Sequence, residues 1–170
     1  MTTQPNNAAM YTSELPNLYN ESVFRLLMDY EIKRSQRYIS PVTLLRIAIV
    51  TPNPSAPELE LGPSVLAGLL NSRLRAADLP ARIGSEYAVL LPTTDTAGGR
   101  AVCERFISAT AGTHTTLRGY SIRLAICIGM TSHPGGPTLA AEPLLQEAEA
   151  ALAKARSRGP QNYLVYADMT

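Results

Sequence analysis

The segment that most restricts the fold is 42–50, with the sequence VTLLRIAIV. It is rich in β-branched residues, and only Thr43 and Arg46 interrupt its apolar run. A strand that is apolar at consecutive positions is typical of a sheet covered on both faces, whereas a strand with one exposed face alternates between apolar and polar residues. The segment therefore predicts a central strand between two covering layers.

Patterns typical of helices and strands alternate through the rest of the chain. The spacing of apolar residues predicts helices over 15–37, 65–77, 97–109 and 142–158. Runs of β-prone residues predict further strands within 79–91, 120–130 and 163–166. The first of these runs is a hairpin that turns at Gly84-Ser85, and the proline-rich segment 51–63 predicts a loop. This order indicates an α/β (α+β) fold with a central, mostly antiparallel, five-stranded sheet flanked by helices.

Length and charge limit the organisation and the partners. The chain has 170 residues, of which 45% are hydrophobic and 17% charged, which suits one globular domain. We expect residues 1–13 to form a flexible N-terminal arm and residues 14–167 to form that domain. The net charge is +1 and no dense Lys/Arg run occurs, so neither a nucleic-acid polymer nor a membrane surface is an expected partner. The sequence shows no membrane-spanning segment and no signal peptide, which predicts a cytoplasmic protein.

The cysteine and histidine residues do not suggest a metal centre. Cys103 and Cys127 are not part of a CxxC motif, and His114 and His133 are isolated from them. A zinc site needs clustered ligands at short spacing. We therefore interpret both cysteines as small core residues.

The predicted hairpin carries the most specific motif in the chain. RAADLPARIGSEYAVLLPTTD, at 75–95, resembles the centre of a GGDEF domain, the diguanylate cyclase fold, which reads roughly RxxDxxxRxGGDEFAVLLPxTD. Other segments resemble the family in the same order and at about the same spacing: 15–24, 41–50, 101–106, 121–134 and 147–162. The resemblance covers residues from about 15 to 166, and it implies the GGDEF fold.

The resemblance also implies what catalysis would require. Active domains of this family join two GTP molecules by attack of a ribose 3′-hydroxyl on an α-phosphate, with the help of metal-binding carboxylates from the first strand and the hairpin. In this chain the first-strand positions hold Ala48 and Val50. Pro63 stands where an acid would contact guanine. Neither an alanine nor a valine side chain offers the oxygen ligands that magnesium needs.

The turn motif and the C-terminal motif are altered as well. GGDEF is shortened to GSEY, so that Gly84, Ser85 and Glu86 would form a vestigial active site, with Glu86 a solvated turn residue. The family's phosphate-binding lysine is Arg156, and Pro160 replaces the arginine of its final GRN motif. We therefore expect no catalytic residues, no bound metal or cofactor, and no cyclase activity.

The residues ahead of the hairpin match the inhibitory site of the family. Arg75 and Asp78 fit its RxxD motif, and Arg105 lies where a third residue often joins from the next helix. The resemblance implies that these three side chains bind cyclic di-GMP, since guanidinium groups pair with phosphate or guanine acceptors and a carboxylate accepts from guanine. The alternative is a structural ion pair between Arg75 and Asp78 at a helix end, which, if exposed, would stabilise the fold by only about a few tenths of a kcal/mol.

Two functions remain open on the sequence alone. The first is a catalytically inactive GGDEF-like receptor that binds cyclic di-GMP and relays the signal to an unidentified protein partner or to a second copy of the chain. The second is a nucleotide-independent interaction module that uses the fold as a scaffold. Arg46, which is unusual in an apolar strand, and Arg82, which opens the hairpin, are not assigned to either function.

Overall fold

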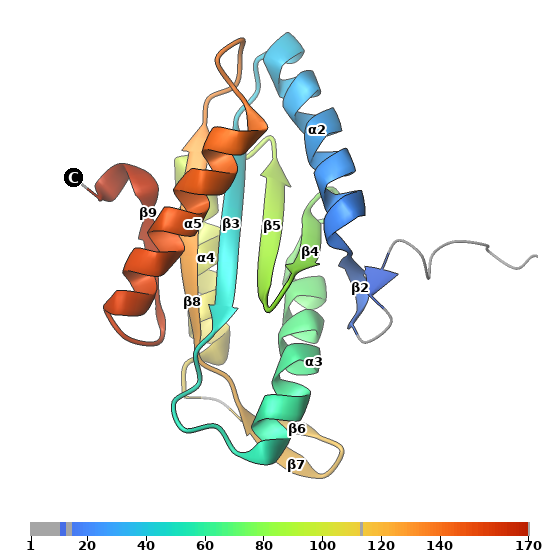
Figure 1. Cartoon of the computed structure of the whole chain (residues 1–170), viewed down its shortest axis with the longest axis vertical. Coiled ribbons are helices and arrows are strands. Elements are labelled where there is room, and N and C mark those ends of the chain that lie inside the picture. The colour runs from blue at the N-terminus through green and yellow to red at the C-terminus, as the bar shows by residue number, and fades with distance from the viewer. Residues whose placement is uncertain (1–10, 13–14, 113, 170) are drawn as a thin grey trace, which may run out of the picture.

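A single sheet with helices on both faces forms the centre of the protein (Figure 1). The computed structural model describes residues 11–12, 15–112 and 114–169. The helices are α2 (Glu21–Tyr38), α3 (Ala56–Arg73), α4 (Thr96–Thr110) and α5 (Ala141–Ser157), followed by a 3-10 turn at Tyr166–Asp168. The strands are β1 (Tyr11–Thr12), β2 (Leu15–Tyr19), β3 (Val42–Ile49), β4 (Leu79–Ile83), β5 (Glu86–Pro92), β6 (His114–Leu117), β7 (Tyr120–Arg123), β8 (Ile126–His133) and β9 (Asn162–Val165).

The predicted central strand is confirmed. β3 pairs antiparallel with β5 on one side and with β8 on the other. Leu45 and Ile47 pack in the cluster under α3 and α4, whereas Val42 and Leu44 pack in the cluster under α2 and α5. All four side chains are buried, which explains why the strand is apolar at consecutive positions.

The sheet is larger and more mixed than the sequence predicted. Its order is β1-β2-β4-β5-β3-β8-β9, so it has seven strands rather than five. β2 pairs with β4 and β8 pairs with β9 in parallel, and the other four pairings are antiparallel. A prediction from local patterns finds hairpins easily, because their strands are adjacent in the chain. The two parallel pairings join strands that are far apart in sequence.

The N-terminal part of the predicted helix 15–37 is a strand. β2 covers Leu15–Tyr19, and α2 begins only after Asn20, whose side chain accepts a hydrogen bond from the Val23 amide at 2.9 Å. Asn17 has φ 71°, which no α-helix accepts. The expected flexible arm 1–13 lies outside the described residues except for Tyr11–Thr12, which form β1.

The proline-rich segment 51–63 is a loop only in its first part. α3 begins at Ala56 because Ser55 and Glu58 form a capping box, in which the Glu58 amide donates to Ser55 Oγ and the Ser55 amide to Glu58 Oε1. A proline in the first helical turn costs no backbone hydrogen bond, because the N–H at that position has no partner within the helix. Pro63 lies farther along, inside the helix. The prediction of a loop over the whole segment was therefore wrong.

The segment predicted as one strand, 120–130, is two strands. β7 pairs with β6 as a separate two-stranded ribbon, and β8 enters the main sheet. The carboxylate of Glu58 fastens this ribbon to the start of α3, because it accepts from the Arg123 guanidinium at 2.9 Å and from the Arg123 amide at 2.8 Å. These hydrogen bonds, with that from Ser55, hold the pKa of Glu58 far below its ordinary value of 4.5.

This contact predicts a loss of stability in acid. A carboxyl whose pKa is depressed in the folded state stabilises the protein above the unfolded-state pKa, and this stabilisation is lost as the pH falls and the unfolded chain binds the proton first. We expect the urea midpoint of the wild type to fall between about pH 6 and about pH 3. The urea midpoint of the Glu58→Gln variant should be lower than that of the wild type at about pH 6, and it should decrease less as the pH falls. Parallel pH profiles of the two proteins would contradict this role of Glu58.

Candidate functional site

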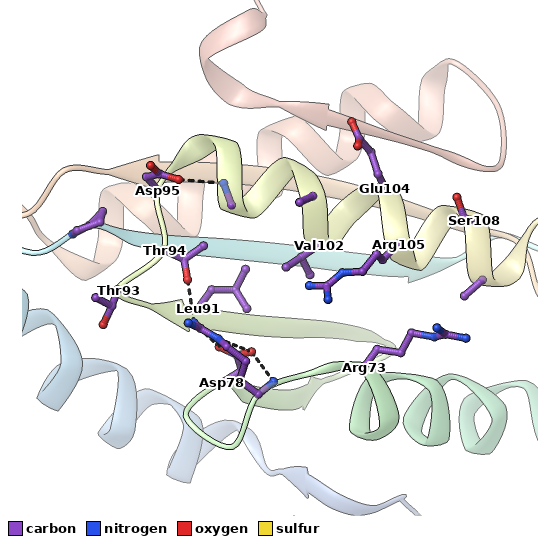
Figure 2. A pocket seen from close by; sticks show the side chains of 15 residues that line it. Arg73, Asp78, Leu91, Thr93, Thr94, Asp95, Val102, Glu104, Arg105 and Ser108 are labelled. Carbon is purple, nitrogen blue, oxygen red and sulfur yellow. Dashed lines mark hydrogen bonds and ion pairs between the residues drawn. The ribbon is translucent and has the colours of Figure 1, made fainter.

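An open cleft lies between the segment that follows α3 and the exposed side of α4 (Figure 2). Its volume is about 1080 Å³. The residues that line it with charged or polar side chains are Arg73, Arg75, Asp78, Thr93, Thr94, Asp95, Glu104, Arg105 and Ser108. The three residues predicted to bind a ligand, Arg75, Asp78 and Arg105, therefore line one cleft, although Arg105 lies beyond the hairpin, in α4.

Arg75 and Asp78 are joined directly in the turn that follows α3. Arg75 Nη2 donates to Asp78 Oδ1 at 2.9 Å, and the Arg75 amide donates to Asp78 Oδ2 at 2.8 Å. The side chain of Asp78 is only 2% exposed, whereas that of Arg75 is 57% exposed. The structural alternative, an ion pair at i,i+3, is thus present, but in a turn beyond the helix. The role of Asp78 in ligand binding stays a prediction.

The Arg75 guanidinium is also attached to the end of the hairpin. Nη2 donates to the Pro92 carbonyl and to Thr94 Oγ1, both at 2.8 Å. Thr94 Oγ1 in turn donates to the same Pro92 carbonyl at 3.0 Å. These contacts tie the turn after α3 to the segment between β5 and α4, and they fix the orientation of Arg75 in the lining of the cleft.

Arg73 and Arg105 lie on opposite walls of the cleft and are exposed. Figure 2 shows Arg73 extending from the last residue of α3 and Arg105 from the middle of α4. Among the described residues, 11–12, 15–112 and 114–169, neither guanidinium takes part in a hydrogen bond or an ion pair. Sequence reasoning missed Arg73, although its position two residues before Arg75 was a visible signal.

The acids that line the cleft are engaged with other groups. Asp95 caps α4 by accepting from the Gly98 amide at 2.9 Å. Glu104 accepts from the Tyr163 hydroxyl at 2.8 Å, and in Figure 2 it points away from Arg105. Burial, and then the hydrogen bond to Glu104, raise the pKa of Tyr163 above its ordinary value. The two exposed arginines are therefore not neutralised by a neighbouring carboxylate in direct contact.

The predicted vestigial active site lies at the other end of the hairpin and does not line this cleft. Gly84 and Ser85 form its exposed turn, in which Gly84 has φ 62° as a tight hairpin requires. Glu86 is not a solvated turn residue: Oε1 accepts from Arg46 Nε at 3.0 Å and Oε2 from Arg156 Nη1 at 3.1 Å. This arrangement gives Arg46 the partner that the sequence did not reveal.

The other altered positions have structural surroundings. Ala48 is buried in a small cluster with Cys127 and Leu152, and Val50 packs against that cluster. Pro63 lies inside α3, and Pro160 is exposed after α5. Arg82, at the start of the hairpin, donates to the Gly84 carbonyl at 3.1 Å and lies over the Tyr87 ring, which is a structural role.

In the described part of the chain, no three His, Cys, Asp or Glu side chains lie close enough together to hold a metal ion. None of the helices in the same part has both the length and the apolar character needed to cross a membrane. Cys103 and Cys127 are buried and free, as the sequence predicted for core residues.

Comparisons with known proteins agree with this architecture. A family model described as "Diguanylate cyclase, GGDEF domain" matches residues 64–162. The diguanylate cyclase DgcP of Pseudomonas aeruginosa is 35% identical over 96 residues, which are 56% of this chain. The match spans only 14% of the length of DgcP.

Several solved structures share the fold. The GGDEF domain of FimX from Pseudomonas aeruginosa is 22% identical, with a TM-score of 0.80 over 92% of this chain and 98% of that one. The GGDEF domain of DgcB from Caulobacter crescentus, solved in complex with c-di-GMP, is 13% identical, with a TM-score of 0.83 over 98% of both chains. The diguanylate cyclase SiaD from Pseudomonas aeruginosa, solved with its activator SiaC, is 23% identical, with a TM-score of 0.79 over 94% of this chain and 62% of SiaD. The family model, which covers more than half of the chain, and the shared architecture lead to one conclusion: the chain belongs to the diguanylate cyclase GGDEF-domain family.

Proposed function

We propose that this domain is a receptor for cyclic di-GMP that has lost cyclase activity and that relays the signal to a protein partner. The observation that carries the proposal is the cleft of about 1080 Å³ into which Arg73, Arg75 and Arg105 all face. Cyclic di-GMP presents two phosphodiester charges and two guanine bases. Guanidinium groups pair with phosphate oxygens and with the N7 and O6 acceptors of guanine, and they stack on purine faces.

The complex of the DgcB domain with c-di-GMP supports this proposal at the level of the fold. A direct test is calorimetric titration of cyclic di-GMP into the folded wild-type protein. Saturable binding with a dissociation constant of the order of micromolar is the expected result. A well-folded protein that releases no heat on titration would reject the receptor function and leave the scaffold function.

The proposed loss of activity rests on the surroundings of Glu86. Its two carboxylate oxygens each accept from a different guanidinium, Arg46 and Arg156. Two cations beside the one acid would repel a divalent metal ion, and the side chains of Ala48 and Val50 supply no oxygen ligands. The residues present therefore do not fit the magnesium pair that the family's chemistry uses.

This part of the proposal predicts the outcome of an activity assay. The purified protein, incubated with GTP and either Mg²⁺ or Mn²⁺, should form no cyclic product above a mock preparation. An active GGDEF domain assayed in parallel shows that the conditions support turnover. Product that scales with the concentration of this protein would reject the proposed inactivity. Ligand binding at the cleft would still be tested separately by the calorimetric titration.

A nucleotide-independent interaction module is the second candidate. α2 exposes large apolar side chains that the domain itself does not cover: Leu26 is 71% exposed, Tyr30 68% and Tyr38 67%, and Ile39 beyond the helix is 68% exposed. Exposed apolar groups on one element are typical of contact surfaces. The complex of SiaD with its activator SiaC is an example of a GGDEF-family protein with a protein partner.

A further inference from the structure

The outer side of α2 carries a regular row of exposed side chains, which we call the outer seam. Its four residues follow one another at steps of four, three and four positions: Leu26, Tyr30, Lys33 and Arg37. The buried residues of the helix, among them Phe24, Met28 and Ile32, lie on the opposite side. Steps of three and four residues are the spacing with which one helix packs along another. The outer seam therefore has the form of a helix-packing surface, although α2 uses its other side for the core of the domain.

The two halves of the outer seam differ in chemistry. The first half, Leu26 and Tyr30, is apolar and aromatic, and the second half, Lys33 and Arg37, is cationic. Beside the seam, Asp29 is exposed as well. Among residues 11–12, 15–112 and 114–169, neither Asp29 nor Lys33 has an ion-pair partner. The domain itself thus leaves two opposite charges and two large apolar side chains uncovered on one helix.

The outer seam is separate from the cleft. α2 packs with α5 on one face of the sheet, and α3 and α4 pack on the other face. Figure 1 shows α2 at the edge of the molecule. The cleft is lined from the turn after α3 and from α4, and none of the outer-seam residues is part of its lining. A contact at the outer seam therefore does not use the residues that we propose bind the nucleotide.

The order of the side chains makes the outer seam complementary to itself. When two copies of α2 run antiparallel about a two-fold axis, the apolar half of each seam faces the cationic half of the other. In the register that sets Leu26 opposite Arg37 of the second copy, Tyr30 lies opposite Lys33 of the second copy. The aliphatic part of the arginine then covers the leucine, and the lysine ammonium lies over the tyrosine ring.

The charge of Asp29 fits the same arrangement. It lies one residue before Tyr30, so it comes next to Lys33 of the second copy, and the two-fold axis forms this ion pair twice. A parallel pair of helices would instead set each cation of the seam against the same cation of the other copy. An acidic partner helix would suit Lys33 and Arg37, but it would also meet the carboxylate of Asp29. These contrasts favour a second copy in antiparallel orientation.

We infer that the outer seams of two copies of this domain pack antiparallel and form a weak homodimer that needs no nucleotide. The inference goes beyond the proposed receptor function and does not depend on it. A contact between two single helices buries less area than a standard protein interface. We therefore expect a dissociation constant on the order of 100 µM.

Analytical ultracentrifugation of the nucleotide-free protein measures this equilibrium. The average mass of the wild type should rise with concentration, from that of one chain toward that of two. Asp29→Lys and Lys33→Glu should each weaken the association at least about ten-fold, because either change puts like charges at two symmetric positions. An equimolar mixture of the two variants should associate about as strongly as the wild type, since every lysine at these positions then faces a carboxylate.

Lys154→Glu is the matched control. It makes the same change of charge on an exposed residue of α5, away from the outer seam, and it should leave the association unchanged. Tyr30→Ala should weaken the association, because it removes the ring that faces Lys33 of the second copy. Thermal unfolding of each variant is recorded beside the centrifugation, and stability close to that of the wild type is expected because all the substituted residues are exposed.

Three results would overturn the inference. The first is a wild type that stays monomeric up to about 1 mM, roughly ten times the expected dissociation constant. The second is a mixture of Asp29→Lys and Lys33→Glu that associates no more strongly than either variant alone. The third is a Lys154→Glu control that is weakened as much as Lys33→Glu. None of these measurements involves cyclic di-GMP, so failure of the dimer and failure of the receptor function are distinguishable.

Discussion

The Arg105→Ala variant is expected to lose at least about ten-fold in affinity for cyclic di-GMP while it remains as stable as the wild type. Arg105 is exposed in the middle of α4, and the described structure gives its guanidinium no internal contact that the substitution would break. Alanine is also a better helix former than arginine. The change therefore removes the cation that we propose binds the ligand, and it removes nothing that the fold requires.

The choice of Arg105 over Arg75 follows from the buried carboxylate. Arg75→Ala would leave Asp78 without its partner in a site where its side chain is 2% exposed, and such a loss is strongly destabilising. Weak binding by that variant would mix a binding effect with a folding effect. Calorimetry on Arg105→Ala, with thermal unfolding as the control, separates the two. Unchanged affinity in a folded Arg105→Ala protein would show that the cleft is not the binding site.

The second large effect concerns folding. Gly129 in β8 lies against the backbone of α5: a Cβ atom added there would stand 2.2 Å from the Leu152 nitrogen and 2.3 Å from the Ala148 carbonyl oxygen. Both atoms belong to a helix backbone, which cannot move away as a side chain end can. We expect Gly129→Ala to lower the free energy of unfolding by roughly 3 kcal/mol, at the upper end of over-packing effects, and the Tm by roughly 10 °C.

Gly68 in α3 provides the matched control. A Cβ added at Gly68 meets nothing within 4 Å, so Gly68→Ala should leave the protein unchanged or stabilise it by about half a kcal/mol through the higher helix propensity of alanine. Urea unfolding of the two variants beside the wild type measures the difference. Equal stability of Gly129→Ala and the wild type would mean that α5 does not pack as closely on β8 as described.

The sequence predicted those features that depend on local patterns. The central strand around Leu45, the hairpin that turns at Gly84-Ser85 and the end of the last helix before Gly159 all follow from runs of side chains and from backbone preferences. It failed where two local signals competed. At α3 the capping box of Ser55 and Glu58 favours a helix, whereas the nearby prolines suggest a loop. The helix forms because proline is tolerated in the first helical turn.

The register of the motif also identified three residues that lie close together in the fold. Arg75, Asp78 and Arg105 were named from the sequence, and the structure brings all three to one cleft. Spacing along the chain could not say how these groups are bonded. The spacing of residues along a helix or strand shows which face each side chain occupies. Its hydrogen-bond partner on another element depends on how the elements pack.

What the sequence by itself determined is therefore the layered architecture, the family and the neighbourhood of the cleft. Only the tertiary structure decided the roles within it. Pro92 and Thr94 hold Arg75 in place from the far end of the hairpin, and Arg46 and Arg156 reach Glu86 from two other elements. These contacts join segments that only the packing of the layers brings together, so no spacing along the chain could have predicted them.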